Sequence, residues 1–194
     1  MHGRQALLLT VHGMDMRKKS AKAAFGGVFS ALCVTLMFFT GLVPFATYAF
    51  PMLAGAMLVP IMAELGRGAA AMVYISVSLL SVFVVPDREA VVVFVAFFGY
   101  YPIAKGVLEK LPSRVLEYTF KIALFNAALA GSFSLAVYVL GMAEILRGIG
   151  DFGRYAAIFF LLAGNAVFIA YDIALTNYYT SYVKWFKPRF LRRQ

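Results

Sequence analysis

The run from Ala23 to Ala63, AAFGGVFSALCVTLMFFTGLVPFATYAFPMLAGAMLVPIMA, holds 41 residues without one charge. A single α-helix of that length would rise about 60 Å, twice the roughly 30 Å of a bilayer's hydrocarbon core. Near its middle, the segment TGLVPFATYAFP (residues 40–51) supplies helix breakers at Gly41, Pro44 and Pro51. The run therefore predicts two membrane-spanning helices joined by a loop.

The rest of the chain continues this pattern. Of its 194 residues, 62% are hydrophobic and 14% are charged, whereas soluble domains are about 45–50% apolar and about 25% charged. Further apolar stretches predict spans at 68–86, 90–105, 122–143 and 155–183. The predicted fold is an all-α integral membrane protein with six transmembrane helices in residues 21–184, between basic cytoplasmic tails at 1–20 and 185–194.

The distribution of positive charge predicts the orientation. Six spans place both termini on one side, and all but three of the 18 Lys and Arg residues fall at that set of helix ends; the exceptions are Arg88, Arg147 and Arg154. By the positive-inside rule, both termini are cytoplasmic. The net charge of +9 is then accounted for by topology and anionic lipid headgroups, and its distribution argues against nucleic-acid binding.

The sequence offers no pattern typical of catalysis or of a bound cofactor. The two histidines, His2 and His12, lie in the N-terminal tail, and Cys33 is the single cysteine, so we expect no metal site and no disulfide. No G-x-x-x-x-G-K-[ST] motif occurs, so any ATP-derived energy must come from another subunit. We expect a protein that is not an enzyme and that carries no cofactor.

The first predicted span carries small residues on one side. In the segment KKSAKAAFGGVFSAL (residues 18–32) these are Ala23, Gly26, Gly27, Ser30 and Ala31. Small residues every four positions let membrane helices approach closely. Two interpretations stay open, namely packing against another helix of the same chain and docking of a separate membrane subunit. The position beside the basic segment, in the cytoplasmic half of the helix, favours docking.

Length, six spans, cytoplasmic termini and this small-residue face resemble the substrate-binding S component of energy-coupling-factor transporters. The segment GLVPFATYAFPMLAGAMLVPIMAELGRGAAAMVYISVSLLSVFVVP (residues 41–86) is also similar to that family's second and third helices with the preceding loop. These proteins import vitamins and trace nutrients across bacterial and archaeal plasma membranes. The resemblance implies a small-molecule nutrient as substrate, and a transmembrane coupling subunit, itself bound to two ATPases, that docks on Ala23, Gly27 and Ala31.

The resemblance also places the substrate near the outer face, below the first loop and between helices four, five and six. The predicted topology puts several polar side chains in that zone, of which we select Thr47, Tyr48, Arg88, Asn126 and Asn165. Each has a structural alternative. Arg88 can be a solvated loop charge, the two asparagines can hydrogen-bond across helices, and neighbouring Asp87 fits a helix N-cap.

Asp172, in FIAYDIALTNYY (residues 168–179), is the one acid inside an apolar run. It lies about 26 Å below the outer end of the sixth span, near the cytoplasmic end, where Lys105 and Lys121 are available as partners. A structural ion pair and a coupling or proton-relay role both stay open.

Two other functions remain alternatives to the importer subunit. An accessory membrane protein that assembles a complex without transport would share the small-residue face but lack a ligand pocket. A small secondary transporter is less favoured, because the halves at residues 21–105 and 106–184 show no convincing repeat.

Overall fold

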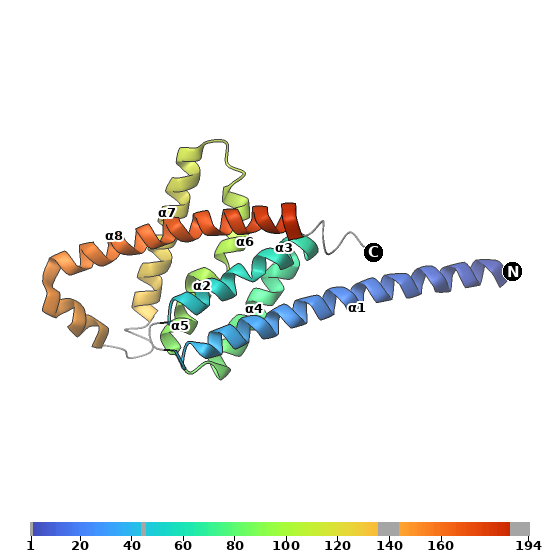
Figure 1. Cartoon of the computed structure of the whole chain (residues 1–194), viewed down its shortest axis with the longest axis horizontal. Coiled ribbons are helices and arrows are strands. Elements are labelled where there is room, and N and C mark those ends of the chain that lie inside the picture. Colours follow the sequence, from blue (N-terminus) through green and yellow to red (C-terminus); the bar gives the residue numbers. More distant parts are fainter. Residues whose placement is uncertain (1, 44–45, 136–143, 187–194) are drawn as a thin grey trace.

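The computed structural model describes residues 2–43, 46–135 and 144–186, with the side chains of 20–43, 46–135 and 158–185. Every regular element in these ranges is helical, as predicted (Figure 1). In chain order they are α1 (His2–Phe39), α2 (Ala49–Ala56), α3 (Leu58–Leu65), α4 (Arg67–Val84), α5 (Arg88–Val93), the π-helix η1 (Phe94–Phe98), α6 (Tyr101–Leu108), α7 (Arg114–Ser134), α8 (Glu144–Ser181) and the π-helix η3 (Tyr182–Phe186).

Among the described residues, four helical stretches are long and apolar enough to cross a membrane, which makes this a helical membrane protein. They are Ser20–Phe39, Arg67–Val84, Arg88–Leu108 and Ile158–Trp185. A shorter apolar helical stretch, Ala49–Leu65, joins the first two. The predicted break in the 41-residue run is confirmed, because α1 ends at Phe39 and α2 begins at Ala49.

The helices reverse direction along the chain, and the start of α1 and the end of α8 lie at the same end of the molecule (Figure 1). The α1 helix packs mainly against α4 and α2, and α3 packs against α4. The α2 helix also approaches η1 very closely. A Cβ at Gly55 would lie 2.2 Å from the carbonyl oxygen of Phe98, so only glycine fits at this crossing.

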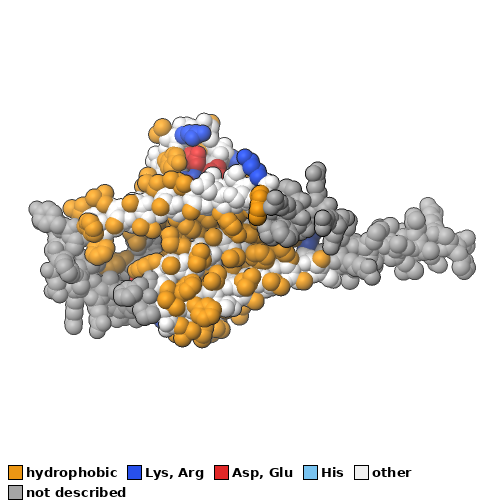
Figure 2. All heavy atoms as spheres, viewed as in Figure 1, with side chains coloured by type: hydrophobic (Ala, Val, Ile, Leu, Met, Phe, Trp, Pro, Cys, Tyr) orange, Lys and Arg blue, Asp and Glu red, His pale blue; other side chains and the backbone are white. Residues whose placement is uncertain are grey.

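An aromatic core joins η1 and α6 to α7 and α8. The rings of Phe125 and Phe168 stack with centroids 4.8 Å apart, and those of Phe97 and Tyr101 stack at 4.7 Å. The outer surface is apolar as well, as lipid-facing helices require, and Phe83 is 83% exposed. Figure 2 shows hydrophobic side chains over most of one face and charged ones gathered near the α6–α7 junction.

Three helices extend beyond the boundaries that the sequence predicted for membrane spans. The fifth span was expected to begin at residue 122, but α7 begins at Arg114, because its charged Lys121 is buried against an acid of the same chain instead of facing lipid. The α8 helix begins at Glu144, and its apolar stretch, Ile158–Trp185, begins close to the expected start of the sixth span at residue 155. Residues 2–20, predicted as a basic tail, are helical and continue α1, whose apolar stretch begins at Ser20. The end of the fifth span, over 136–143, lies outside the described residues.

Candidate functional site

The small residues of α1 separate into two rows. Gly26 and Ser30 are half-buried and belong to the side that packs on α4, since a Cβ at Gly26 would lie 3.8 Å from Cγ2 of Val73. The Ser30 hydroxyl donates to the carbonyl oxygen of Gly26 at 2.8 Å, so it needs no partner from outside its own helix. This row therefore serves packing within the chain.

The second row, Ala23, Gly27 and Ala31, is exposed. A Cβ at Gly27 would meet no described atom within 4 Å. The chain therefore does not use this row to pack its own described helices. A row of small side chains that stays open on a membrane helix allows the backbone of another helix to come close.

Two of the predicted outer polar residues lie in contacts between neighbouring loops. Tyr48, directly before α2, is 54% exposed and its hydroxyl donates to Oε1 of Glu89 in α5. Arg88 is also exposed and its guanidinium donates to the carbonyl oxygen of Val82 at the end of α4. Thr47 is half-buried in the turn beside Tyr48. The loop after α1 and the turn after α4 are thus connected.

The N-cap expected at Asp87 is confirmed. Its carboxylate accepts a hydrogen bond from the backbone N–H of Ala90 at 3.1 Å, at the start of α5. An aspartate at this position satisfies an amide that the first helical turn leaves without a partner. Asp87 is therefore a structural residue that fixes the position of Arg88 and Glu89.

Asn126 of α7 and Asn165 of α8 bond to each other in both directions, at 3.0 and 3.1 Å between Nδ2 and Oδ1. Each amide nitrogen also donates to the carbonyl oxygen four residues earlier, at 2.8 Å in both helices. Both N–H bonds of each amide are thus in use. This geometry matches the alternative in which the two asparagines hydrogen-bond to each other across helices. Of the amide atoms, only the oxygens can accept a further hydrogen bond.

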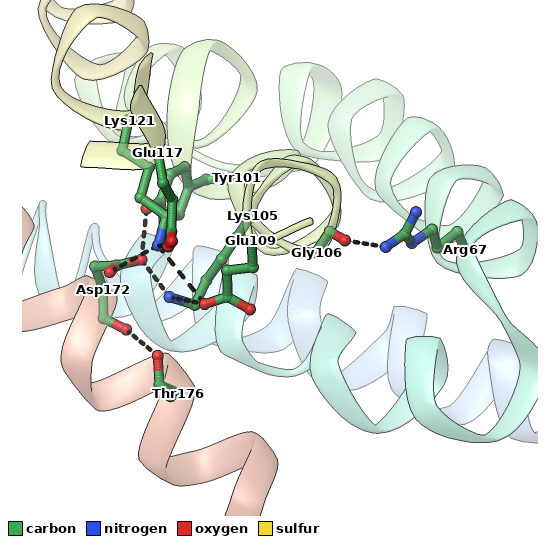
Figure 3. A network of polar contacts seen from close by, with 9 residues as sticks. All are labelled: Arg67, Tyr101, Lys105, Gly106, Glu109, Glu117, Lys121, Asp172 and Thr176. Carbon is green, nitrogen blue, oxygen red and sulfur yellow. Dashed lines mark hydrogen bonds and ion pairs between the residues drawn. The ribbon is translucent and has the colours of Figure 1, made fainter. Parts of the chain in front are cut away.

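Asp172 of α8 is the centre of a buried polar cluster (Figure 3). Its Oδ1 accepts a hydrogen bond from the Tyr101 hydroxyl at 2.6 Å and also contacts the Lys105 ammonium, while Oδ2 lies 3.1 Å from Nζ of Lys121. Asp172, Lys105 and Lys121 are only 3%, 6% and 1% exposed. Both lysines that the sequence made available as partners are thus paired with this acid.

Two glutamates complete the cluster. Glu109 lies 2.8 Å from Nζ of Lys105 and 3.6 Å from Nζ of Lys121, and Glu117 lies 2.7 Å from Nζ of Lys121. Two ammonium groups therefore face three carboxylates contributed by α8, α7 and the end of α6. Buried charges are tolerated when each has a close partner of opposite sign, and this arrangement connects α6, α7 and α8 at one end of the bundle.

Two cavities flank this cluster. One, of about 400 Å³, lies between α3, α6, α8 and the start of α4, and its lining includes Arg67, Lys105 and Lys110. The other, of about 460 Å³, is lined by Lys121, Glu117 and Asp172 among others. Both lie at the cluster's end of the bundle, the end opposite the loops that carry Tyr48 and Arg88.

Sequence reasoning missed Tyr101, Glu109 and Glu117 as members of the cluster. The spacing contained a signal for them, because Tyr101, Lys105 and Glu109 recur every four residues, and so do Glu117 and Lys121. Residues four apart share one helical face. A lysine inside an apolar helix with an acid one turn away indicates a charge that is neutralised within the protein.

Comparison of the chain with protein-family models, with curated proteins and with solved structures found no match.

Proposed function

We propose that this protein is the substrate-binding subunit of an ATP-driven importer of a small nutrient in a prokaryotic plasma membrane. A separate transmembrane coupling subunit with its ATPases supplies the energy. The observation that carries the proposal is the exposed row of Ala23, Gly27 and Ala31, which no described part of the chain covers. It adds to the resemblance noted from the sequence, in which the coupling subunit docks on these positions.

The proposed topology has six membrane crossings and cytoplasmic termini. The four long apolar stretches supply four of these crossings, and the stretch Ala49–Leu65 and α7 supply the other two. A 17-residue helix rises about 25 Å, close to the thickness of the hydrocarbon core. The charges in the first turns of α7 are compatible with a crossing because Lys121 is paired with Asp172 and Glu117.

The nutrient binds in this proposal at the outer end, near Thr47, Tyr48 and Arg88, with Asn126 and Asn165 deeper in the bundle. The contact of Tyr48 with Glu89 supports it, because this contact holds the first loop against α5. If the Tyr48 hydroxyl bonded to the substrate instead of Glu89, the loop after α1 would have a second position. The asparagine pair would contribute through its amide oxygens, since its N–H groups are in use.

The docking surface is tested by Gly27→Leu, with Ala21→Leu as the matched control. A Cβ at 27 would meet no described atom within 4 Å, so leucine adds its bulk to the open row. Ala21 is also exposed on α1, but it lies about 120° away around a helix of 3.6 residues per turn. We expect Gly27→Leu to abolish co-purification of the coupling subunit and nutrient uptake while nutrient binding stays intact. The control should behave as wild type.

Unchanged association in Gly27→Leu would refute docking through this row. Native mass spectrometry of the protein extracted from its own membranes separates the importer subunit from an accessory protein. An importer subunit retains a small molecule of defined mass in addition to its docked partner. An accessory protein retains the partner alone.

A further inference from the structure

We propose that the cavity of about 400 Å³ between α3, α6 and α8 binds the phosphate headgroup of an anionic phospholipid from the cytoplasmic leaflet. The cavity lies at the end of the bundle that carries most of the positive charge, and it combines basic with apolar lining. This inference adds a lipid site to the protein and does not depend on the docking row of α1. It does use the proposed orientation of the helices.

Three cations and one carboxylate line the cavity, namely Arg67, Lys105, Lys110 and Glu109. The carboxylate is paired within the protein, because Glu109 lies 2.8 Å from Nζ of Lys105 and 3.6 Å from Nζ of Lys121. Asp172 contacts the same Lys105 ammonium, so the single charge of Lys105 is shared between two acids and is not available to a ligand. Arg67 and Lys110 are therefore the two cations that can meet an anion in the cavity.

Arg67 is held in a position suited to this role. Its guanidinium donates through Nη2 to the carbonyl oxygen of Gly106 (Figure 3), and a guanidinium has five N–H donors in total. A Cβ at Gly106 would lie 3.0 Å from this same Nη2, so glycine leaves room for the arginine. Among the described residues the guanidinium makes no other hydrogen bond or ion pair, so its other donors can meet a phosphate, the anion that guanidinium groups match in bidentate geometry.

Lys110 and the start of α4 add positive potential at the same place. Lys110 is exposed and forms no ion pair within the part of the chain that the structure describes. The 18-residue α4 begins after Gly66 without a side-chain cap. Its first amides and its helix dipole therefore favour an anion nearby, in support of the charged side chains.

The apolar part of the cavity indicates a lipid instead of free phosphate. Val59 and Met62 of α3 and Leu175 of α8 line it together with the basic side chains. These residues belong to helical stretches that are apolar enough to lie in a membrane. Basic pockets between membrane helices on the cytoplasmic side are known sites for anionic headgroups, and an acyl chain attached to the phosphate would follow the apolar wall.

The test uses the full-length protein in nanodiscs with equal amounts of phosphatidylglycerol and phosphatidylcholine, followed by native mass spectrometry of the lipids retained. We expect wild type to retain phosphatidylglycerol selectively. The double variant Arg67→Gln and Lys110→Gln should reduce that retention about thirtyfold, since each cation near an anionic lipid contributes about fivefold. The matched control, Lys22→Gln with Lys184→Gln, removes two exposed cations outside the cavity lining and should retain the lipid as wild type does.

Several outcomes would overturn the proposal. If wild type retained phosphatidylcholine and phosphatidylglycerol equally, the charge of the lipid would have no role. If the control variant lost as much phosphatidylglycerol as the Arg67 and Lys110 double variant, the effect would come from general surface charge. Displacement of the lipid by millimolar inorganic phosphate would show a site for free phosphate. Lys110→Gln alone guards against misfolding, because this exposed side chain has no ion pair among the described residues; wild-type retention in that variant would also count against the site.

Discussion

Two polar contacts join α7 to α8, and they differ in kind. The Asn126–Asn165 pair is neutral, half-buried and complete by itself, because each amide uses its second N–H on its own helix. Asp172, two helical turns further along α8, is charged and only 3% exposed. Its carboxylate takes its partners from two other helices, Tyr101 and Lys105 of α6 and Lys121 of α7.

The difference follows from the cost of burying each group. An amide away from water needs its hydrogen bonds, which here a second amide and a carbonyl oxygen of the same helix supply. A buried carboxylate needs opposite charge as well, and each lysine that supplies it must be neutralised in turn. The cluster therefore extends to Glu109 and Glu117. The asparagine pair fixes two helices to each other, whereas the cluster fixes three.

Loss of Lys121 should have the largest effect on stability. Its ammonium contacts three carboxylates, at 2.7, 3.1 and 3.6 Å. Lys121→Met would leave those acids with Lys105 as the only ammonium in the cluster. We expect the free energy of unfolding to fall by about 3–5 kcal/mol, the cost of leaving a buried charge without its partner. Unfolding in mixed detergent and SDS micelles measures it.

Lys184→Met is the control for this prediction, because Lys184 is an exposed lysine at the same end of the molecule. It should change the unfolding free energy by less than about 1 kcal/mol. Similar losses in the two variants would show that the cluster contributes nothing beyond an ordinary surface charge.

Much of this cluster could be predicted from the sequence. The position of Asp172 along its helix placed it at the level of Lys105 and Lys121, and the structure pairs it with both. The start of α7 could not be predicted in the same way, because a rule based on charge-free stretches excludes Lys121 from the helix. A charge that is neutralised within the protein does not interrupt a membrane helix. Glu117, one turn before Lys121, was a local signal of this, whereas the pairing with Asp172 depends on contact with a distant segment.

The two rows on α1 show a second limit. Spacing placed five small residues on one side of α1 in two neighbouring rows, Ala23, Gly27 and Ala31 beside Gly26 and Ser30. Which of them contact the chain's own helices depends on where α4 packs, and the structure turns Gly26 toward Val73 while it leaves Gly27 open. The two rows lie side by side, so a small rotation of α1 about its axis decides which of them faces α4. Residue spacing does not determine that rotation.

Asp172→Asn should destabilise the protein less than Lys121→Met. Each lysine keeps a glutamate after this change, Lys105 with Glu109 at 2.8 Å and Lys121 with Glu117 at 2.7 Å. The expected loss is about 1.5–3 kcal/mol, the range for hydrogen bonds to a charged group, measured by the same unfolding assay. If Asp172→Asn lowers the free energy of unfolding by more than Lys121→Met does, this prediction is wrong. The Asp172 carboxylate would then contribute more to stability than the Lys121 ammonium.

The asparagine pair should have the smallest effect, and its double variant should separate the two kinds of contact. Asn126→Leu leaves the Asn165 amide without its cross-helix partner, and we expect a loss of about 0.6 kcal/mol, the average for such bonds in membrane proteins. Replacing both asparagines by leucine removes both unsatisfied groups, so the double variant should be at least as stable as the single one. If the double variant lost as much unfolding free energy as the two single variants together, the pair would contribute more than the hydrogen bonds that each amide gives the other. Such additivity would make Asn126 and Asn165 candidates for contact with a third group, the role that the proposed substrate site requires of their amide oxygens.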